Sequence, residues 1–297
     1  MRKINLSKVF FIISVFIFGT ISLFVKNINL SSEEIALYRA MIAFSCLFVF
    51  LVVQGKLVSF ERIKEQIISF AISGALMGFN WILLFESYNY TSVSVATLAY
   101  YFAPVIVTFV SSFVFKEKLS AKNKLCILFS FLGIILVSGI IEDHFSKSNF
   151  IGFLLAFLAA IFYACVILLN KTFKDVDAIN RTLIQFAFAI VVLLPYVLIK
   201  RGINIFSIDD ISLINLLILG IVHTGIVYCL YFYSIKNMLG QEIGILSYID
   251  PVVAICLSVI VLEETMSLIQ YIGSIIIIAF AIVNEIRFKK NIVCDEY

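Results

Sequence analysis

The sequence YYFAPVIVTFVSSFVFKEKLS, residues 100–120, returns 147 residues later as SYIDPVVAICLSVIVLEETMS, residues 247–267. At this offset, identical residues coincide in the pairs Tyr101 and Tyr248, Pro104 and Pro251, Ser111 and Ser258, Glu117 and Glu264, and Gly78 and Gly225. The chain therefore contains two related halves. We expect the first half to cover residues 1–145 and the second to cover residues 146–297.

The composition is that of a membrane protein. Of 297 residues, 62% are hydrophobic and 14% are charged, whereas soluble domains contain about 25% charged residues. Apolar runs of about 20 residues recur along the chain, long enough to cross the ~30 Å hydrocarbon core as helices. We predict an all-α integral membrane protein with ten transmembrane helices, over residues 8–26, 33–54, 66–86, 92–115, 122–141, 149–170, 181–199, 211–235, 240–262 and 268–287.

The distribution of basic residues predicts the orientation of these spans. If the N-terminus is cytoplasmic, 17 lysines and arginines lie in inner segments and four in outer loops. Because basic residues concentrate in cytoplasmic loops, we expect both termini inside the cell membrane. Five spans per half is an odd number, so the second half is expected to be inverted. The repeated turns agree: KEKLSAKNK is basic and inner, whereas EETMS has no base and is outer.

These features resemble the drug/metabolite transporter superfamily, and specifically its ten-helix EamA-type members. The resemblance rests on the repeated apolar stretch with a proline and a Glu-x-x-Ser turn, on Arg39 early in the second span, and on Gly74 and Gly78 in the third. It implies a secondary transporter with two inverted repeats and a site between them. Similar sequences move amino acids, nucleosides, choline-like cations, sugars and toxic compounds. One departure within the repeat matters: Asp250 stands where the first half has Ala103.

Asp250 is the first candidate for substrate binding and for ion coupling. It lies about ten residues into the ninth span, about 15 Å deep at 1.5 Å per residue. A charge at the bilayer centre costs about 2.5–3.5 kcal/mol, so such residues are functional candidates. The alternative is a structural acid that is protonated or bonded to a neighbouring helix. Glu242 lies about 80° away around the same helix. It is either a coupling residue or a carboxylate favoured by the helix N-terminus.

Arg39 and His223 each allow two interpretations. Arg39 could hold a substrate carboxylate, but we favour a structural role in which it snorkels outward or pairs with Glu33, Glu34 or Glu86. The ring of His223 titrates in a range that suits proton coupling. A hydrogen-bonded packing histidine is equally consistent with its position in the eighth span.

Aromatic and polar residues of the cavity-lining helices complete the candidate site. Tyrosine and tryptophan faces bind ammonium groups by cation–π contact. The alternative role for these aromatic residues is to anchor helix ends at the membrane–water interface. The cavity candidates are Asn80, Trp81, Tyr100, Tyr101, Tyr163, His223, Tyr228, Tyr248 and Asp250. We assign structural roles to Arg39, Pro104, Pro251, Glu117 and Glu264.

The sequence thus favours a secondary active transporter that is driven by proton coupling or exchange. It contains no H-E-x-x-H, G-x-S-x-G or P-loop motif, so a membrane-embedded enzyme is a distant alternative and direct ATP coupling is not expected. A mid-membrane acid among aromatics favours an amine-containing substrate, first an amino acid and second a choline-like cation. We expect a small-molecule substrate and the lipid bilayer as partners, no cofactor, metal or nucleic acid, and a monomer or weak homodimer.

Overall fold

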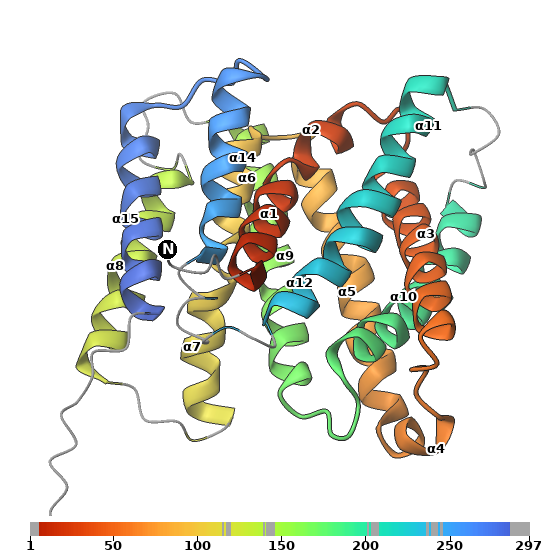
Figure 1. Cartoon of the computed structure of the whole chain (residues 1–297). Coiled ribbons are helices and arrows are strands. Elements are labelled where there is room, and N and C mark those ends of the chain that lie inside the picture. The colour runs from red at the N-terminus through yellow and green to blue at the C-terminus, as the bar shows by residue number, and fades with distance from the viewer. Residues whose placement is uncertain are drawn as a thin grey trace, which may run out of the picture.

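The structure is a computed structural model that describes residues 6–114, 116, 120–138, 140, 146–200, 202, 208–235, 238, 243 and 246–285. Its regular elements are helices (Figure 1). They are α1 Leu6–Gly19, α2 Ile21–Lys26, α3 Ser32–Val53, α4 Phe60–Ile63, η1 Lys64–Gln66, α5 Ile67–Ser87, α6 Val93–Tyr100, α7 Ala103–Val114, α8 Ala121–Val137, α9 Lys147–Asn170, α10 Ala178–Lys200, α11 Asp210–Leu217, η3 Ile218–Ile226, α12 Val227–Ile235, α14 Ile249–Ile260 and α15 Leu268–Glu285.

These helices follow the order of the predicted spans. Seven continuous or jointed helices in the described part of the chain are long and apolar enough to cross a membrane. The shorter helices α8, α14 and α15 occupy the fifth, ninth and tenth predicted spans. The all-α fold class is therefore confirmed. The first part of the ninth span, with Glu242, lies outside the described residues, and so does Glu117.

Three predicted spans differ from single uniform helices. The first is interrupted at Thr20, between α1 and α2, and the fourth at residues 101–102, between α6 and α7. The eighth continues from α11 through the π-helix η3 into α12. A π-helix widens the turn by one residue and often marks a functional position. Here it contains His223 and Thr224, whose side chains bond to carbonyls five residues earlier.

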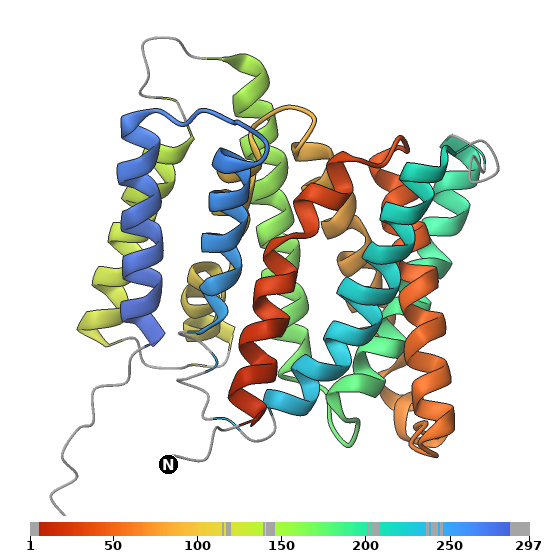
Figure 2. The same ribbon diagram turned by 45° about the horizontal axis from the view of Figure 1, so that its top comes forward.

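Helix packing follows the internal repeat. Helix α5 contacts α9, and its repeat counterpart α12 contacts α1, the counterpart of α9. In the same way α5 contacts α10, and η3 contacts α3. Helix α8 packs against its repeat equivalent α15, and α6 of the fourth span packs against α14 of the ninth. Figures 1 and 2 show α8 beside α15, and α1 between α14 and α12. The contacts of α5 with α9 and with α10 are thus reproduced when the two halves are exchanged.

Two glycine contacts show that this correspondence extends to single residues. A Cβ at Gly78 would lie 3.0 Å from the side chain of Leu193, and one at Gly225 would lie 2.9 Å from the Cβ of Cys46. Gly78 and Gly225 are one repeat length apart, and so are Cys46 and Leu193. Small residues let helices approach closely in membranes. A glycine of the first half thus contacts the second half at Leu193, and the equivalent glycine of the second half contacts the first half at Cys46.

The repeated helix is interrupted at the same place in both halves. Tyr101 has φ −72° and ψ 5°, and Tyr248 has φ −74° and ψ −3°. Each tyrosine lies three residues before a proline, Pro104 or Pro251. Proline offers no N–H to the carbonyl one turn earlier, so a continuous helix would lose a hydrogen bond there. Broken helices of this kind place polar backbone groups inside the membrane, as many transporters do.

We expect the close approach at Gly74 to be more sensitive to substitution than the one at Gly78. A Cβ at Gly74 would lie 2.5 Å from the backbone oxygen of Gln185, whereas at Gly78 it meets only the side chain of Leu193. Overpacking costs about 1–3 kcal/mol, and alanine gains about 1 kcal/mol of helix propensity over glycine. Gly74→Ala should therefore lower the apparent melting temperature of the purified protein, and Gly78→Ala should change it little. Equal melting temperatures for the two variants would contradict the described packing of α5 on α10.

Candidate functional site

Asp250 lies in the first turn of α14, about 15 Å by helical rise from its last residue. Its carboxylate accepts a hydrogen bond from the hydroxyl of Tyr101, which belongs to the other half. Asp250 as a whole residue is half-buried. Its backbone carbonyl lies so close to α1 that a Cβ at Gly19 would be 2.6 Å away. The acid is thus held between α1 and the break of the repeated helix.

A row of tyrosine rings starts at this carboxylate with Tyr101. The ring of Tyr100 stacks on that of Tyr163, with centroids 5.4 Å apart, and the ring of Tyr101 meets Tyr100 edge-on at 6.0 Å. Tyr228 of α12 meets Phe18 of α1 edge-on at 5.4 Å, one residue before the Gly19 that approaches Asp250. We name five of these residues, Tyr100, Tyr101, Tyr163, Tyr228 and Asp250, the central site.

Tyr163 is the most exposed residue of the central site. It lies in the middle of α9, its ring stacks on that of Tyr100, and 39% of the residue is exposed. Asn80 is instead almost fully buried. It donates to the carbonyl of Ala159 at 2.6 Å and accepts from Tyr100 at 3.4 Å, so it orients the Tyr100 ring.

Trp81 lies beside Arg39, not in the central site itself. The guanidinium carbon of Arg39 is 4.6 Å from the centre of the Trp81 ring and 5.7 Å from that of Phe85. On its other side Trp81 meets Phe186, whose ring in turn contacts Tyr228 at 6.0 Å. Trp81 and Tyr248 are both only 6% exposed. An aromatic row thus runs from Arg39 to the central site.

The predicted pairing of Arg39 with a glutamate is wrong for the described residues. Glu34 caps its own helix through Ser31, Glu86 accepts from Ser32, and Glu33 forms an ion pair with Lys200. Arg39 does not extend outward either, because its Nε donates to Thr224 in η3 at 2.9 Å. Sequence reasoning did not identify Thr224, since a threonine in an apolar span carries no signal of its own.

His223 joins the eighth span to the interruption in the first. Its Nε2 lies 2.8 Å from the Thr20 hydroxyl and its Nδ1 lies 3.3 Å from the carbonyl of Ile218. The ring edge packs on Phe24 at 4.7 Å, and the residue is 1% exposed. Both ring nitrogens therefore have partners within packed helices. These contacts are those of a packing histidine and do not bring it into the central site.

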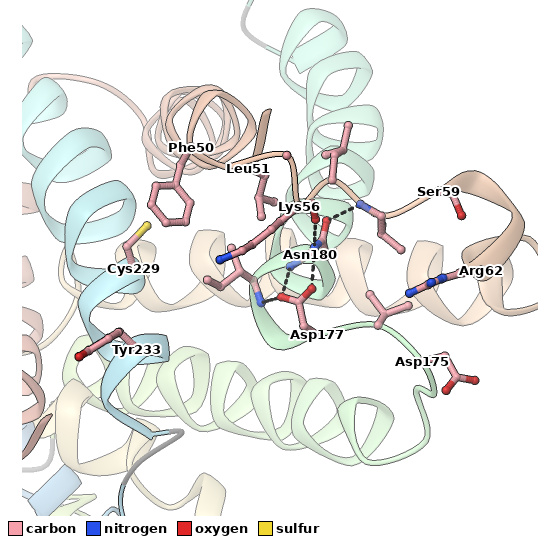
Figure 3. A pocket seen from close by; sticks show the side chains of 15 residues that line it. Phe50, Leu51, Lys56, Ser59, Arg62, Asp175, Asp177, Asn180, Cys229 and Tyr233 are labelled. Atoms are coloured by element: carbon pink, nitrogen blue, oxygen red, sulfur yellow. Dashed lines mark hydrogen bonds between the residues drawn. The ribbon is translucent and has the colours of Figure 1, made fainter. Parts of the chain in front are cut away.

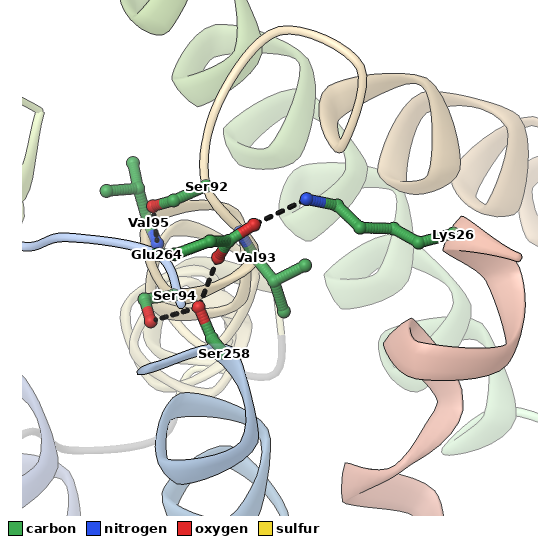
Figure 4. A network of polar contacts seen from close by, with 7 residues as sticks. All are labelled: Lys26, Ser92, Val93, Ser94, Val95, Ser258 and Glu264. Atoms are coloured by element: carbon green, nitrogen blue, oxygen red, sulfur yellow. Dashed lines mark hydrogen bonds and ion pairs between the residues drawn. The ribbon is translucent and has the colours of Figure 1, made fainter. Parts of the chain in front are cut away.

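At the expected outer end, Glu264 ties the halves together (Figure 4). It accepts from Lys26 at the end of α2, from Ser258 of α14, and from the backbone N–H of Val93 at 2.7 Å. Ser94 extends the chain of bonds by donating to Ser258 at 2.8 Å. We call these five residues the outer network. Glu264 and Ser258 carry a signal in the sequence through the repeat, whereas Lys26 and Ser94 do not.

At the expected cytoplasmic end, a cavity of about 740 Å³ opens between α3, α10 and α12 (Figure 3). Its walls include Phe50, Cys229 and Tyr233, and its rim is organised by Asn180, which donates to the carbonyl of Lys56 at 2.9 Å. This volume lies within the range of ligand-sized pockets. A second cavity of about 490 Å³ lies beside the outer network. Among the described residues, no three histidines, cysteines or acids gather as they would for a metal ion.

Comparison with known proteins identifies the family. The sequence model of the EamA-like transporter family matches twice, over residues 6–139 and 150–285. A Bacillus subtilis protein named uncharacterized transporter YxxF is 32% identical over 96% of this chain and 91% of its own length. An uncharacterized transporter of Archaeoglobus fulgidus is 25% identical over 90% of this chain and 92% of its own.

Two further matches are more distant. A Salmonella typhimurium protein named probable amino-acid metabolite efflux pump is 24% identical over 60% of this chain and 62% of its own length. A protein of known crystal structure shares the fold with a TM-score of 0.66 at 16% identity, over 94% of this chain and 97% of its own. The resemblance drawn from the repeat is thereby confirmed, and a transporter is supported over an enzyme. The chain belongs to the EamA-like transporter family.

Proposed function

We propose that this transporter moves a small amine-containing metabolite, in the first place an amino acid, across the cytoplasmic membrane. The observation that carries the proposal is Asp250, a half-buried residue deep in the protein whose carboxylate is bonded to Tyr101 of the other repeat. A carboxylate held there at a cost is a natural partner for an ammonium group or a proton. The surrounding tyrosine faces add cation–π attraction, which strengthens when water is excluded.

The amino-acid class is supported by one relative, the Salmonella protein named as a probable amino-acid metabolite efflux pump. The second candidate is a choline-like cation, favoured by the stacked rings of Tyr100 and Tyr163 beside Asp250. A quaternary ammonium has no N–H to donate to Asp250, so its binding would depend on the rings and on charge. A primary ammonium would in addition bond directly to the carboxylate.

We infer that transport proceeds by alternating access with both termini cytoplasmic. Because the halves make equivalent contacts, each repeat can adopt the conformation of the other. The outer network joins α2, α6 and α14 in the present conformation, and its release would separate the repeats at that end. Coupling to protons or exchange of solutes would supply the driving force, with Asp250 as the coupling residue.

Ligand binding tests the substrate class. We expect L-phenylalanine to raise the apparent melting temperature of the purified wild type, because a ligand that binds the folded state stabilises it. Asp250→Asn should remove this rise by removing the charge that holds the ammonium. Asp210→Asn, at an exposed acid in the first turn of α11, serves as the matched control and should retain it. A rise with choline alone would favour the second candidate, and an unchanged rise in Asp250→Asn would exclude this acid from the site.

Flux measurements test proton coupling separately. In proteoliposomes with an imposed proton gradient, wild-type protein should accumulate radiolabelled L-phenylalanine, and Asp250→Asn should abolish this accumulation while remaining folded. An asparagine cannot take up and release a proton, so the gradient would have no residue through which to act at this site. Accumulation at the wild-type rate by Asp250→Asn would contradict the proposed coupling role.

Cysteine labelling tests the outer network. With the native cysteines replaced, a cysteine at Thr97, 5% exposed and one turn below the network, should react slowly with a charged maleimide added outside. Glu264→Gln should speed this reaction severalfold because it removes the ion pair with Lys26. Glu86→Gln changes another carboxylate whose described partners are Ser32 and Asn89, and it should have no effect. Equal rates in all three proteins would mean that the network does not control access.

A further inference from the structure

The cavity at the expected cytoplasmic end, which we call the inner cavity, has two unlike walls (Figure 3). Phe50 near the end of α3 and Cys229 and Tyr233 of α12 belong to the apolar wall. Lys56 and Arg62, from the segment that follows α3, belong to the basic wall. The residues of the central site are not among the described walls, so the inner cavity is a separate feature of the fold.

Three charged side chains of the inner cavity are available to a ligand. Lys56, Arg62 and Asp175 are exposed, and their charged groups have no hydrogen-bond or ion-pair partner in the part of the chain that the structure describes. Asp177 also lines the cavity, but its carboxylate accepts three hydrogen bonds at the start of α10, where the helix dipole favours a negative charge. The charges without a partner therefore sum to +1, which one phosphodiester would balance.

A buried amide holds the segment that carries Lys56. Asn180 donates to the backbone carbonyl of Lys56 at 2.9 Å and accepts from the backbone N–H of Val58 at 3.0 Å. Its side chain also donates to Asp177 at 2.6 Å. The rim of the cavity is thus fixed to the first turn of α10, and Figure 3 shows Lys56 extending toward the side that carries Phe50 and Cys229. A wall that is already ordered loses little conformational freedom when a ligand binds.

The inner cavity also borders the lipid. Phe50, Leu57 and Tyr233 line it and are exposed, and Phe60 in the adjacent short helix α4 is 66% exposed. Tyrosines collect at the membrane–water interface, where helices leave the hydrocarbon region. Basic residues at this level on the cytoplasmic side meet anionic headgroups. The two walls therefore match the two chemical parts of a phospholipid.

We propose that the inner cavity binds one anionic phospholipid of the surrounding membrane. The phosphate lies at the basic wall with Lys56 and Arg62, and an acyl chain lies along the apolar wall with Phe50 and Tyr233. A soluble phosphate would leave the apolar wall empty, and an apolar ligand would leave both cations without a counter-charge. Because α3 belongs to the first half and α10 and α12 to the second, the bound lipid stabilises the packing of the halves at this end. The proposal is independent of the transported substrate.

Two lipids with identical acyl chains test the proposal: palmitoyl-oleoyl-phosphatidylglycerol, which is anionic, and palmitoyl-oleoyl-phosphatidylcholine, which is zwitterionic. Each is titrated into the delipidated full chain in a neutral detergent, and native mass spectrometry measures the affinity for the first bound lipid. We expect wild-type protein to bind phosphatidylglycerol about tenfold more tightly than phosphatidylcholine, because basic residues attract anionic headgroups. In the double variant Lys56→Gln with Arg62→Gln the two affinities should become equal.

The matched control is the double variant Lys64→Gln with Lys174→Gln. Both lysines are exposed at the same end of the protein and lie outside the described walls of the inner cavity. This variant loses the same charge and should keep the wild-type preference. Loss of the preference in the control, or its retention in Lys56→Gln with Arg62→Gln, would overturn the proposal, because the lipid would then respond to the overall charge of this end. Equal wild-type affinities for the two lipids would overturn it without any variant.

Competition separates a lipid from a soluble anion. Inorganic phosphate and glycerol 3-phosphate should leave phosphatidylglycerol binding unchanged, compared with sodium chloride at the same ionic strength, since neither contacts the apolar wall. Displacement of the lipid by either compound would identify a soluble phosphate site and contradict the proposal.

Melting temperatures give a second measurement on the same proteins. Substitutions at exposed positions usually change stability little, so both double variants should melt near the wild type when no lipid is added. Phosphatidylglycerol should raise the melting temperature of the wild type and of the control, because a ligand that binds the folded state stabilises it. The absence of this rise in the wild type, or an equal rise in Lys56→Gln with Arg62→Gln, would also overturn the proposal.

Discussion

The hydrogen bond from Tyr101 to Asp250 joins the two repeats where both repeated helices are interrupted. A carboxylate at this depth is costly, and so is a carbonyl that has lost its helical partner to a proline. Both costs are confined to one region because the surrounding helices pack closely. Gly19 lets α1 approach the backbone of Asp250, and Tyr101 carries its hydrogen bond on to the stacked rings of Tyr100 and Tyr163. The rest of the structure holds this polar centre inside an apolar protein.

Much of the fold could be predicted from the sequence. The repeat at a fixed offset and the apolar runs gave the all-α class and the order of the spans, because both signals are local or periodic. The central site was partly predictable for the same reason: Tyr101 and Asp250 lie in the repeated stretch, and the family implied a site between repeats. The interruption at Thr20 was not predicted although Gly19 precedes it, because glycine is also frequent within continuous membrane helices.

The surroundings of Arg39 could not be predicted because they depend on contacts distant in sequence. Glu33, Glu34 and Glu86 were plausible partners by proximity along the chain and by depth. In the structure each has a closer partner, such as the Ser31 cap that holds Glu34. Thr224 reaches Arg39 from 185 positions away, through a π-helix that no local pattern announces. Long-range polar contacts of this kind decide whether a buried charge is structural or available to a ligand.

The paired contacts of Gly78 with Leu193 and Gly225 with Cys46 have a thermodynamic consequence. Suppose that the outward-facing state has the same packing as the inward-facing state, with the two halves in exchanged roles. A contact that each half makes equally with the other then contributes the same free energy to both states, and it cancels from the free-energy difference between them. Only positions that differ between the halves can then set the resting population. A protein in which both members of a symmetric pair are changed together should lose stability without shifting that population, whereas a change at one member alone would shift it.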